Sequence, residues 1–151
     1  MQYAVSMISL GIDYGSKKLG LALSDTGGLM AFPHMVIPND GNALQEIVRI
    51  VAEKKVGAVV MGDTLSSAGV ENQVTKEARV FGARLEKELC LSIQWVSEAG
   101  TSGAARVGWG EGEVRGMVQS PRKEKRDDLH DARAAALILQ RFLDVHREAR
   151  P

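Results

Sequence analysis

Two runs of alternating residues near the start of the chain constrain its fold more than any other feature. In residues 8–13 and again in residues 19–24, large apolar side chains alternate with Ser, Gly, Ala or Asp. This period of two is typical of β-strands, and the short segment between the runs predicts a tight turn. One face of the strand pair is then apolar. The other carries only small side chains up to Asp13, which leaves room for something large to approach that carboxylate.

The same glycines allow a second interpretation. Gly11, Gly15 and Gly20 could serve only the turn and the packing of a helix, with Asp13 as a solvated turn residue. The alternation alone leaves both interpretations open.

The rest of the chain predicts an α/β protein. Apolar spacing indicates further strands at 35–37, 56–61 and 91–96, and helices at 42–55, 71–89 and 129–145. The strand at 56–61 is almost continuously apolar, as expected of a central parallel strand covered on both faces. We therefore expect a five-stranded mixed sheet, three antiparallel strands followed by two parallel ones, flanked by helices. Four glycines predict a mobile loop over residues 108–127.

Composition narrows the class of protein. A chain of 151 residues predicts one domain, residues 1–151, and 44% hydrophobic with 25% charged residues is ordinary for a globular protein. The net charge is zero, so bulk electrostatics does not indicate a polyanionic partner. The sequence has no apolar run of 18 residues, which predicts no membrane segment. A cytoplasmic location is expected, and Cys90, the single cysteine, is expected to be a small buried residue ending a helix.

Three acidic residues are candidates for a common site. Asp13 and Glu98 each follow a predicted strand, and the carboxyl ends of parallel strands are where open α/β sheets bind ligands. Asp131 precedes Ala135 and Ile138 by four and seven residues, which places it on the inward stripe of the last helix. Converging carboxylates repel one another unless a cation neutralises them. Oxygen ligands favour Mg²⁺ or Mn²⁺, and two such ions can drive phosphodiester hydrolysis.

Each acid also has a structural interpretation that the sequence leaves open. Asp131 could be the first-turn acid of a helix capped by Asp128, and Glu98 could cap a following helix. Asp63, after the fourth strand, is either a fourth carboxylate of the site or an ordinary turn residue.

Three motifs together resemble a known family. They are residues 11–20 with Ser24-Asp25, Glu98 with Thr101-Ser102, and residues 131–140. The chain resembles the YqgF family, also called RuvX-like, of proposed Holliday junction resolvases in the ribonuclease H-like superfamily. The resemblance implies a ribonuclease H-like fold and a Mg²⁺- or Mn²⁺-dependent nuclease, with Asp13, Glu98 and Asp131 as catalytic and metal-binding residues. The family's proposed roles are resolution of branched DNA and maturation of the 5′ end of 16S ribosomal RNA.

One motif departs from the family pattern. The family usually has Asp-Glu-Arg where this chain has Ser97-Glu98-Ala99, so a flanking acid and an arginine are missing. An arginine can hold a phosphate through two parallel hydrogen bonds, and Ala99 cannot. We expect weaker phosphate binding at this position.

The leading hypothesis is an endonuclease acting on Holliday junction DNA or on the 5′ end of precursor 16S rRNA, with a homodimer as an option suggested by junction symmetry. Basic residues expected to contact the nucleic acid are Lys17, Lys18, Arg106, Arg122 and Lys123. The alternative is a non-catalytic nucleic-acid-binding or ribosome-assembly factor of the same fold. A phosphate-binding domain of the actin and hexokinase type is disfavoured, because such enzymes need two domains of this kind.

Overall fold

The computed structural model describes residues 7–63, 72–97 and 123–149, with no side-chain description for residues 123–128 and 147–149. Within these ranges the elements follow one another in chain order: β1 (Ile8–Tyr14), β2 (Lys18–Ser24), β3 (Ala31–Pro38), α1 (Ala43–Lys54), β4 (Val56–Asp63), α2 (Gln73–Leu89), β5 (Ile93–Ser97) and α5 (Lys123–Ala149).

The strands form the five-stranded mixed sheet that the sequence predicts. Their order is β3-β2-β1-β4-β5, which makes β1 the central strand. Strands β1, β2 and β3 pair antiparallel, whereas β4 runs parallel to β1 and β5 parallel to β4. The carboxyl ends of β1, β4 and β5 therefore meet at one edge of the sheet, and Asp13 lies at that edge.

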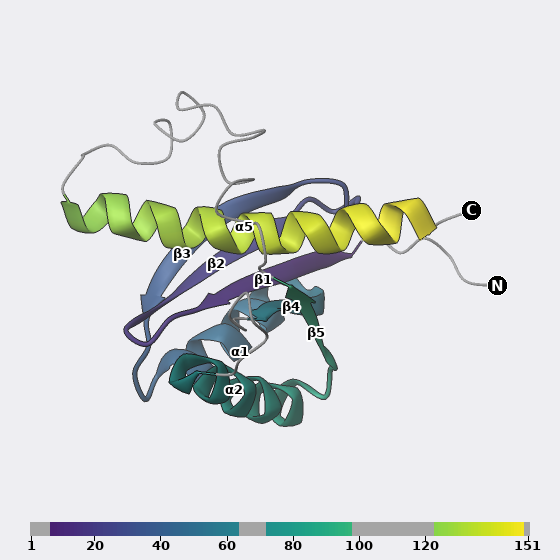
Figure 1. Ribbon diagram of the computed structural model, residues 1–151. Coiled ribbons are helices and arrows are strands. Elements are labelled where there is room, and N and C mark those ends of the chain that lie inside the picture. Colours follow the sequence, from purple (N-terminus) through teal and green to yellow (C-terminus); the bar gives the residue numbers. More distant parts are fainter. Residues whose placement is uncertain (1–6, 64–71, 98–122, 150–151) are drawn as a thin grey trace.

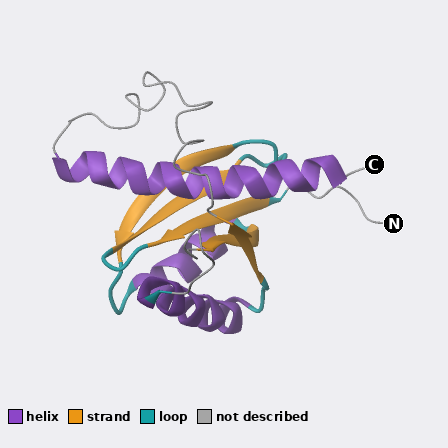
Figure 2. Ribbon diagram, in the orientation of Figure 1, coloured by secondary structure: helices purple, strands orange, loops and turns teal. Residues whose placement is uncertain are grey.

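Helices cover both faces of the sheet. Figure 1 shows α5 crossing one face, with α1 and α2 on the other, and Figure 2 shows the same layers by type of element. The large apolar side chains of β1 and β2, namely Leu10, Ile12, Leu19 and Leu21, are fully buried on the side of α1 and α2. This confirms the apolar face expected from the alternation.

The small-residue face of β1 and β2 is occupied by α5. A Cβ added to Gly11 would lie 2.7 Å from both the carbonyl oxygen of Ala135 and the Cβ of Leu139. Ala22, the cross-strand partner of Gly11, belongs to the same buried cluster as these α5 residues. The room that the sequence indicated is thus filled by a helix of the chain itself, because only glycine and alanine let a helix backbone approach a sheet so closely.

Helix α5 is longer than predicted. It begins at Lys123, so the expectation that residues 108–127 form a loop is wrong for residues 123–127. The remainder of that predicted loop lies outside the described residues. Lys, Glu and Arg favour a helix intrinsically, but the first turn and a half of α5 carries no apolar residue, so hydrophobic spacing gave no signal there.

The end of α2 corrects a second expectation. Cys90 terminates the helix as predicted, with its backbone N–H bonded to the carbonyl of Glu86, but it is exposed rather than buried. Its φ of 55° is the left-handed conformation of a helix cap, which turns the residue away from the buried stripe of α2. In the part of the chain that the structure describes, no helix is both long and apolar enough to cross a membrane.

Candidate active site

Asp13 faces α5 from the edge of the central strand. It is the next-to-last residue of β1, is half-buried, and pairs directly with Gly20 of β2. Side chains alternate along a strand, so Asp13 shares a face with Gly11, whose missing side chain would point into α5. The carboxylate is therefore on the α5 side of the sheet.

Asp131 of α5 lies over β2 at Gly20, the residue that pairs with Asp13. A Cβ on Gly20 would overlap the backbone carbonyl of Asp131 and would lie 3.0 Å from the nitrogen of Ala132. Gly20 is the cross-strand partner of Asp13, and directly opposed positions of a strand pair are about 5 Å apart. The backbone of Asp131 therefore packs beside Asp13, on the neighbouring strand. The structure thus brings Asp13 and Asp131 to one side and one edge of the sheet.

The length of α5 removes one interpretation of Asp131. The residue is the ninth of the helix, so it lies in the third turn and cannot be the first-turn acid of a helix capped by Asp128. A position this deep gains little from the helix dipole, which acts within the first turn. Asp131 is half-buried, and the four- and eight-residue steps from it reach Ala135 and Leu139, which pack on β1.

Two polar side chains of α5 hold the helix in place, and the sequence analysis assigned neither a role. The amide of Gln140 accepts a hydrogen bond from the backbone of Ala31 (2.9 Å) and donates one to the carbonyl of Leu29 (2.9 Å). Arg141 donates to the carbonyl of Ser97 (2.8 Å) at the end of β5. These bonds tie α5 to both outer strands of the sheet, β3 and β5. Their only sequence signal is a polar residue next to an apolar stripe.

Several predicted site residues cannot be placed. Glu98, Arg106 and Arg122 lie outside the described residues, and the side chain of Lys123 is not described. Lys123 itself is the first residue of α5 rather than part of a loop. The described part of β5 ends at Ser97, directly before Glu98.

Asp63 belongs to the opposite side of the sheet. It is the last residue of β4, two positions after Met61, which is buried on the α1 and α2 side. Its carboxylate forms an ion pair with Arg79 of α2 at 3.4 Å, and the guanidinium of Arg79 lies 5.5 Å from the ring centroid of Trp95. The structure therefore excludes Asp63 as a carboxylate beside Asp13. It also corrects the turn interpretation, because Asp63 is still part of β4.

Lys17 and Lys18 lie in and after the turn that follows Asp13. The turn is closed by a 3.0 Å hydrogen bond from the N–H of Gly15 to the carbonyl of Lys18. Lys17 is exposed, and Lys18 is the half-buried first residue of β2. Both cations are thus within a few residues of the acid at the same edge of the sheet.

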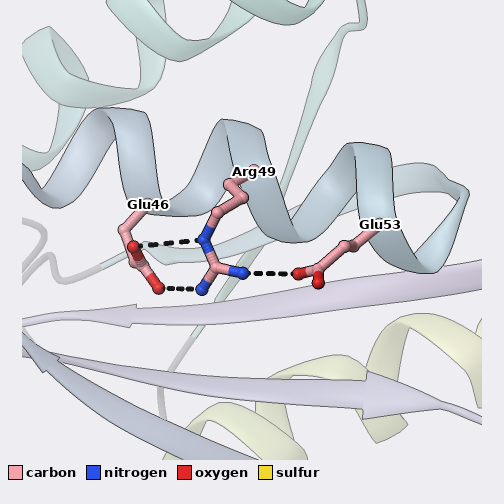
Figure 3. Close-up of polar contacts among 3 residues, drawn as sticks. All are labelled: Glu46, Arg49 and Glu53. Carbon is pink, nitrogen blue, oxygen red and sulfur yellow. Dashed lines mark hydrogen bonds and ion pairs between the residues drawn. The ribbon is translucent and has the colours of Figure 1, made fainter.

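A prominent charged cluster on α1 is not part of this site. Arg49 bonds to Glu46 and to Glu53 on the exposed surface of the helix (Figure 3). The hydrogen bond from Arg49 holds the pKa of the Glu46 carboxyl below its ordinary value. Since Arg49 pairs with one glutamate at i,i+3 and another at i,i+4 spacing, the cluster is explained by local helix stabilisation.

Asp13 and Asp131 offer oxygen ligands only, and such ligands fit Mg²⁺ or Mn²⁺ better than zinc. Within residues 7–63, 72–97 and 123–149, no group of three or more His, Cys, Asp or Glu side chains is arranged to hold a metal ion, and Glu98 is not among those residues. Asp13 of β1 and Asp131 of α5 are the two members of the expected ligand set that lie within the described residues.

Comparisons with known proteins show what the whole chain is similar to. The family model described as "RuvX: Holliday junction resolvase" matches residues 7–145. A protein of Maridesulfovibrio salexigens named "Putative pre-16S rRNA nuclease" is 35% identical over 136 residues, covering 89% of this chain and 96% of its own length. A protein of Burkholderia multivorans with the same name is 32% identical over 144 residues, covering 94% and 92%.

Solved structures share the fold. The chain is similar to Thermus thermophilus RuvC in complex with a Holliday junction substrate, with a TM-score of 0.59, 16% identity, and coverage of 93% of this chain and 96% of that one. It is also similar to the fowlpox virus Holliday junction resolvase, with a TM-score of 0.56, 11% identity, and coverage of 93% and 99%. The expected ribonuclease H-like architecture, here in its RuvC-like form, is confirmed.

Proposed function

The chain belongs to the RuvX family, and from that premise we propose that it is a metal-dependent endonuclease that hydrolyses phosphodiester bonds in structured nucleic acid. One observation carries the proposal. The backbone of Asp131 packs on Gly20, the cross-strand partner of Asp13, so two separated acids share one edge of the sheet.

In this proposal Asp13, Asp131 and Glu98 hold Mg²⁺ or Mn²⁺. Bound there, the cations supply Lewis-acid stabilisation of the negative charge that develops on the phosphate during hydrolysis. The chain's own contribution is to fix the acids: Asp13 through the β1 and β2 ladder, and Asp131 through the packing of α5. The residue directly before Glu98 is also tied to α5, since Arg141 donates a hydrogen bond to the carbonyl of Ser97.

The basic side chains of the protein would bind and orient the nucleic-acid strand. Lys17 and Lys18 are next to the acids at the turn after β1, where they can contact phosphates on either side of the cleaved bond. Arg106, Arg122 and Lys123 are proposed as further phosphate contacts from the segment that leads into α5. Because Ala99 stands where the family has an arginine, we propose that Lys17 and Lys18 contribute more of the phosphate binding.

The relatives and the family point to two substrates. The curated relatives at 32–35% identity are named for precursor 16S rRNA, which makes the 5′ end of that RNA our first candidate. The family model is described as a Holliday junction resolvase, which makes branched DNA the second. On a two-fold symmetric junction we propose that the chain acts as a homodimer, because two equivalent cuts need two copies of the site.

The competing function is a non-catalytic nucleic-acid-binding or ribosome-assembly factor that kept the fold. Incubation of the purified chain with precursor 16S rRNA and with a four-way DNA junction, each in Mg²⁺, Mn²⁺ or EDTA, separates the two. We expect cleavage of at least one substrate in Mg²⁺ or Mn²⁺ and none in EDTA. Binding of both substrates without cleavage in any metal would establish the non-catalytic alternative.

A further inference from the structure

A pocket of about 320 Å³ opens beside the candidate active site, on the opposite face of the sheet. The residues that line it include Tyr14, which follows Asp13 directly in β1, and Phe81 of α2. Asp13 faces α5, whereas Tyr14 packs with the core under α1 and α2. The pocket and the acid are therefore back to back across the last residues of one strand, at the edge where nucleic acid is proposed to bind.

The position of the pocket favours a bound anion. It lies between the beginnings of α1 (Ala43) and α2 (Gln73), because both helices start at the edge where β1 and β4 end. Helix N-termini carry partial positive charge and unsatisfied N–H groups, which attract phosphates. The carboxyl edge of parallel strands is also the usual location of ligands in open α/β sheets.

Two cationic side chains line the pocket. Lys76 and Arg84 lie two helical turns apart on the exposed side of α2. Among the described residues, neither forms an ion pair. Charged side chains at this spacing on one helix face are available to contact phosphate oxygens.

The two acids of the pocket are already engaged. Asp40 accepts a 2.8 Å hydrogen bond from the backbone N–H of Asn42, which shapes the turn into α1. Glu77 accepts a 3.2 Å hydrogen bond from the side chain of Gln73. Both carboxylates keep their negative charge, but part of their hydrogen-bonding capacity is directed at these neighbours. Lys76 and Arg84, by contrast, have no side-chain partner among the described residues.

Aromatic rings give the pocket a surface for a flat ligand. The rings of Tyr14 and Phe81 have centroids 5.4 Å apart and are tilted by 49°. The hydroxyl of Tyr14 forms no hydrogen bond with a described residue, although a tyrosine hydroxyl in a partly buried position usually has a partner. Aromatic side chains beside cations are the combination with which proteins hold unpaired bases and their phosphates.

One side chain joins the pocket to the turn beside the active site. Asn39 lines the pocket and donates a 2.8 Å hydrogen bond from its amide to the carbonyl of Gly15. Its backbone N–H donates to the carbonyl of Lys17, also at 2.8 Å. The path from Asp13 over the exposed Lys17 to the pocket is therefore held as one rigid piece.

We propose that this pocket receives an unpaired nucleotide of the substrate strand next to the cleaved phosphate, with the base against Tyr14 and the phosphates at Lys76 and Arg84. The inference rests on the proposed function and gives it a substrate class. A single nucleotide matches the size of the pocket, whereas a base pair cannot enter between two helices. The enzyme accordingly prefers sites where the nucleotide beside the cut is single-stranded.

The test compares binding of three probes in EDTA, so that no cleavage occurs. The probes are a short single-stranded RNA, the fully paired duplex of the same sequence, and uridine monophosphate. The variant is Lys76→Ala with Arg84→Ala. Its matched control is Lys54→Ala with Lys87→Ala, which removes two cations from the last turns of α1 and α2, away from the pocket.

We expect the pocket variant to bind the single strand about tenfold more weakly, a loss of roughly 1.4 kcal/mol, with a salt slope smaller by about one. Its affinity for the duplex and the affinities of the control should stay within about twofold of wild type. A strand carrying 5-iodouridine is expected to photocrosslink at Tyr14 or Phe81 in the wild type.

Three results would contradict the proposal that the pocket binds an unpaired nucleotide. Equal losses on single strand and duplex would make Lys76 and Arg84 a general electrostatic surface. No loss on either would mean that the strand does not reach α2. Binding of uridine monophosphate as tight as that of the strand would make the pocket a site for a free nucleotide. Since all titrations are done in EDTA, they test nucleotide binding in the pocket even if the chain cleaves nothing. Cleavage assays test the nuclease activity independently.

Discussion

Replacing Asp13 with Asn is expected to lower metal-dependent cleavage by at least about a thousandfold, a loss of roughly 4 kcal/mol of transition-state stabilisation. Asn has the same shape but lacks the negative charge with which Asp13 is proposed to hold the metal on the α5 side of β1. The fold should remain intact. A thermal melt in EDTA should give an unchanged or slightly higher Tm, because one of several converging carboxylates has been neutralised.

The matched control for this substitution is Asp63→Asn. Asp63 ends β4 at the same edge of the sheet but pairs with Arg79 on the opposite face. Its loss of charge should therefore leave cleavage within about threefold of wild type. A large fall in Tm for Asp13→Asn would identify Asp13 as a structural hydrogen-bonding residue, and equal losses of cleavage in both variants would contradict the assignment of the site to one face.

Gly20→Ala should destabilise the chain by about 2–3 kcal/mol, which corresponds to a fall of roughly 5–10 °C in Tm for a domain of this size. The added methyl group would overlap the backbone carbonyl of Asp131, and neither a helix backbone nor a paired strand can move away without breaking other contacts. Because α5 is displaced at Asp131, cleavage by the folded fraction should also fall by at least about tenfold.

Gly27→Ala provides the comparison for this backbone substitution. Gly27 lies in the turn between β2 and β3, where the nearest atom to an added Cβ is an oxygen of Asp25 at an ordinary 3.5 Å. The free energy of unfolding of the Gly27→Ala variant should differ from that of wild type by less than about 0.5 kcal/mol. If urea titrations gave the same small change for both variants, α5 would not pack on β2 as described.

The sheet could be predicted from the sequence because its signals are local. Alternation in β1 and β2 and the apolar run of β4 depend only on neighbouring residues, and these patterns predict the strand directions that the structure shows. The small-residue face was recognised but not its occupant. A ligand and a helix make the same demand for glycine at positions 11 and 20, and only the tertiary packing of α5 distinguishes them.

The errors in the candidate site have similar causes. The apolar run predicts that β4 ends at Met61, which leaves the direction of the Asp63 side chain open. Two more residues of strand fix its side chain toward α2, since alternation continues to the end of the ladder. The first residues of α5 have no apolar stripe, so the sequence does not indicate that the helix begins at Lys123. It therefore does not indicate that Asp131 lies in the third turn rather than the first.

The metal site itself is tested most directly by adding Mn²⁺, at a small fraction of the protein concentration, to isotope-labelled protein and recording its amide NMR spectrum. A paramagnetic ion held by Asp13 and Asp131 is expected to broaden the signals of Asp13, Gly20 and Asp131 first, and to leave those of Glu46 and Glu53 on α1 sharp. The same addition to Asp13→Asn should broaden none of them at that concentration. Broadening that begins on α1, or that persists unchanged in Asp13→Asn, would contradict the claim that these two acids form one metal site.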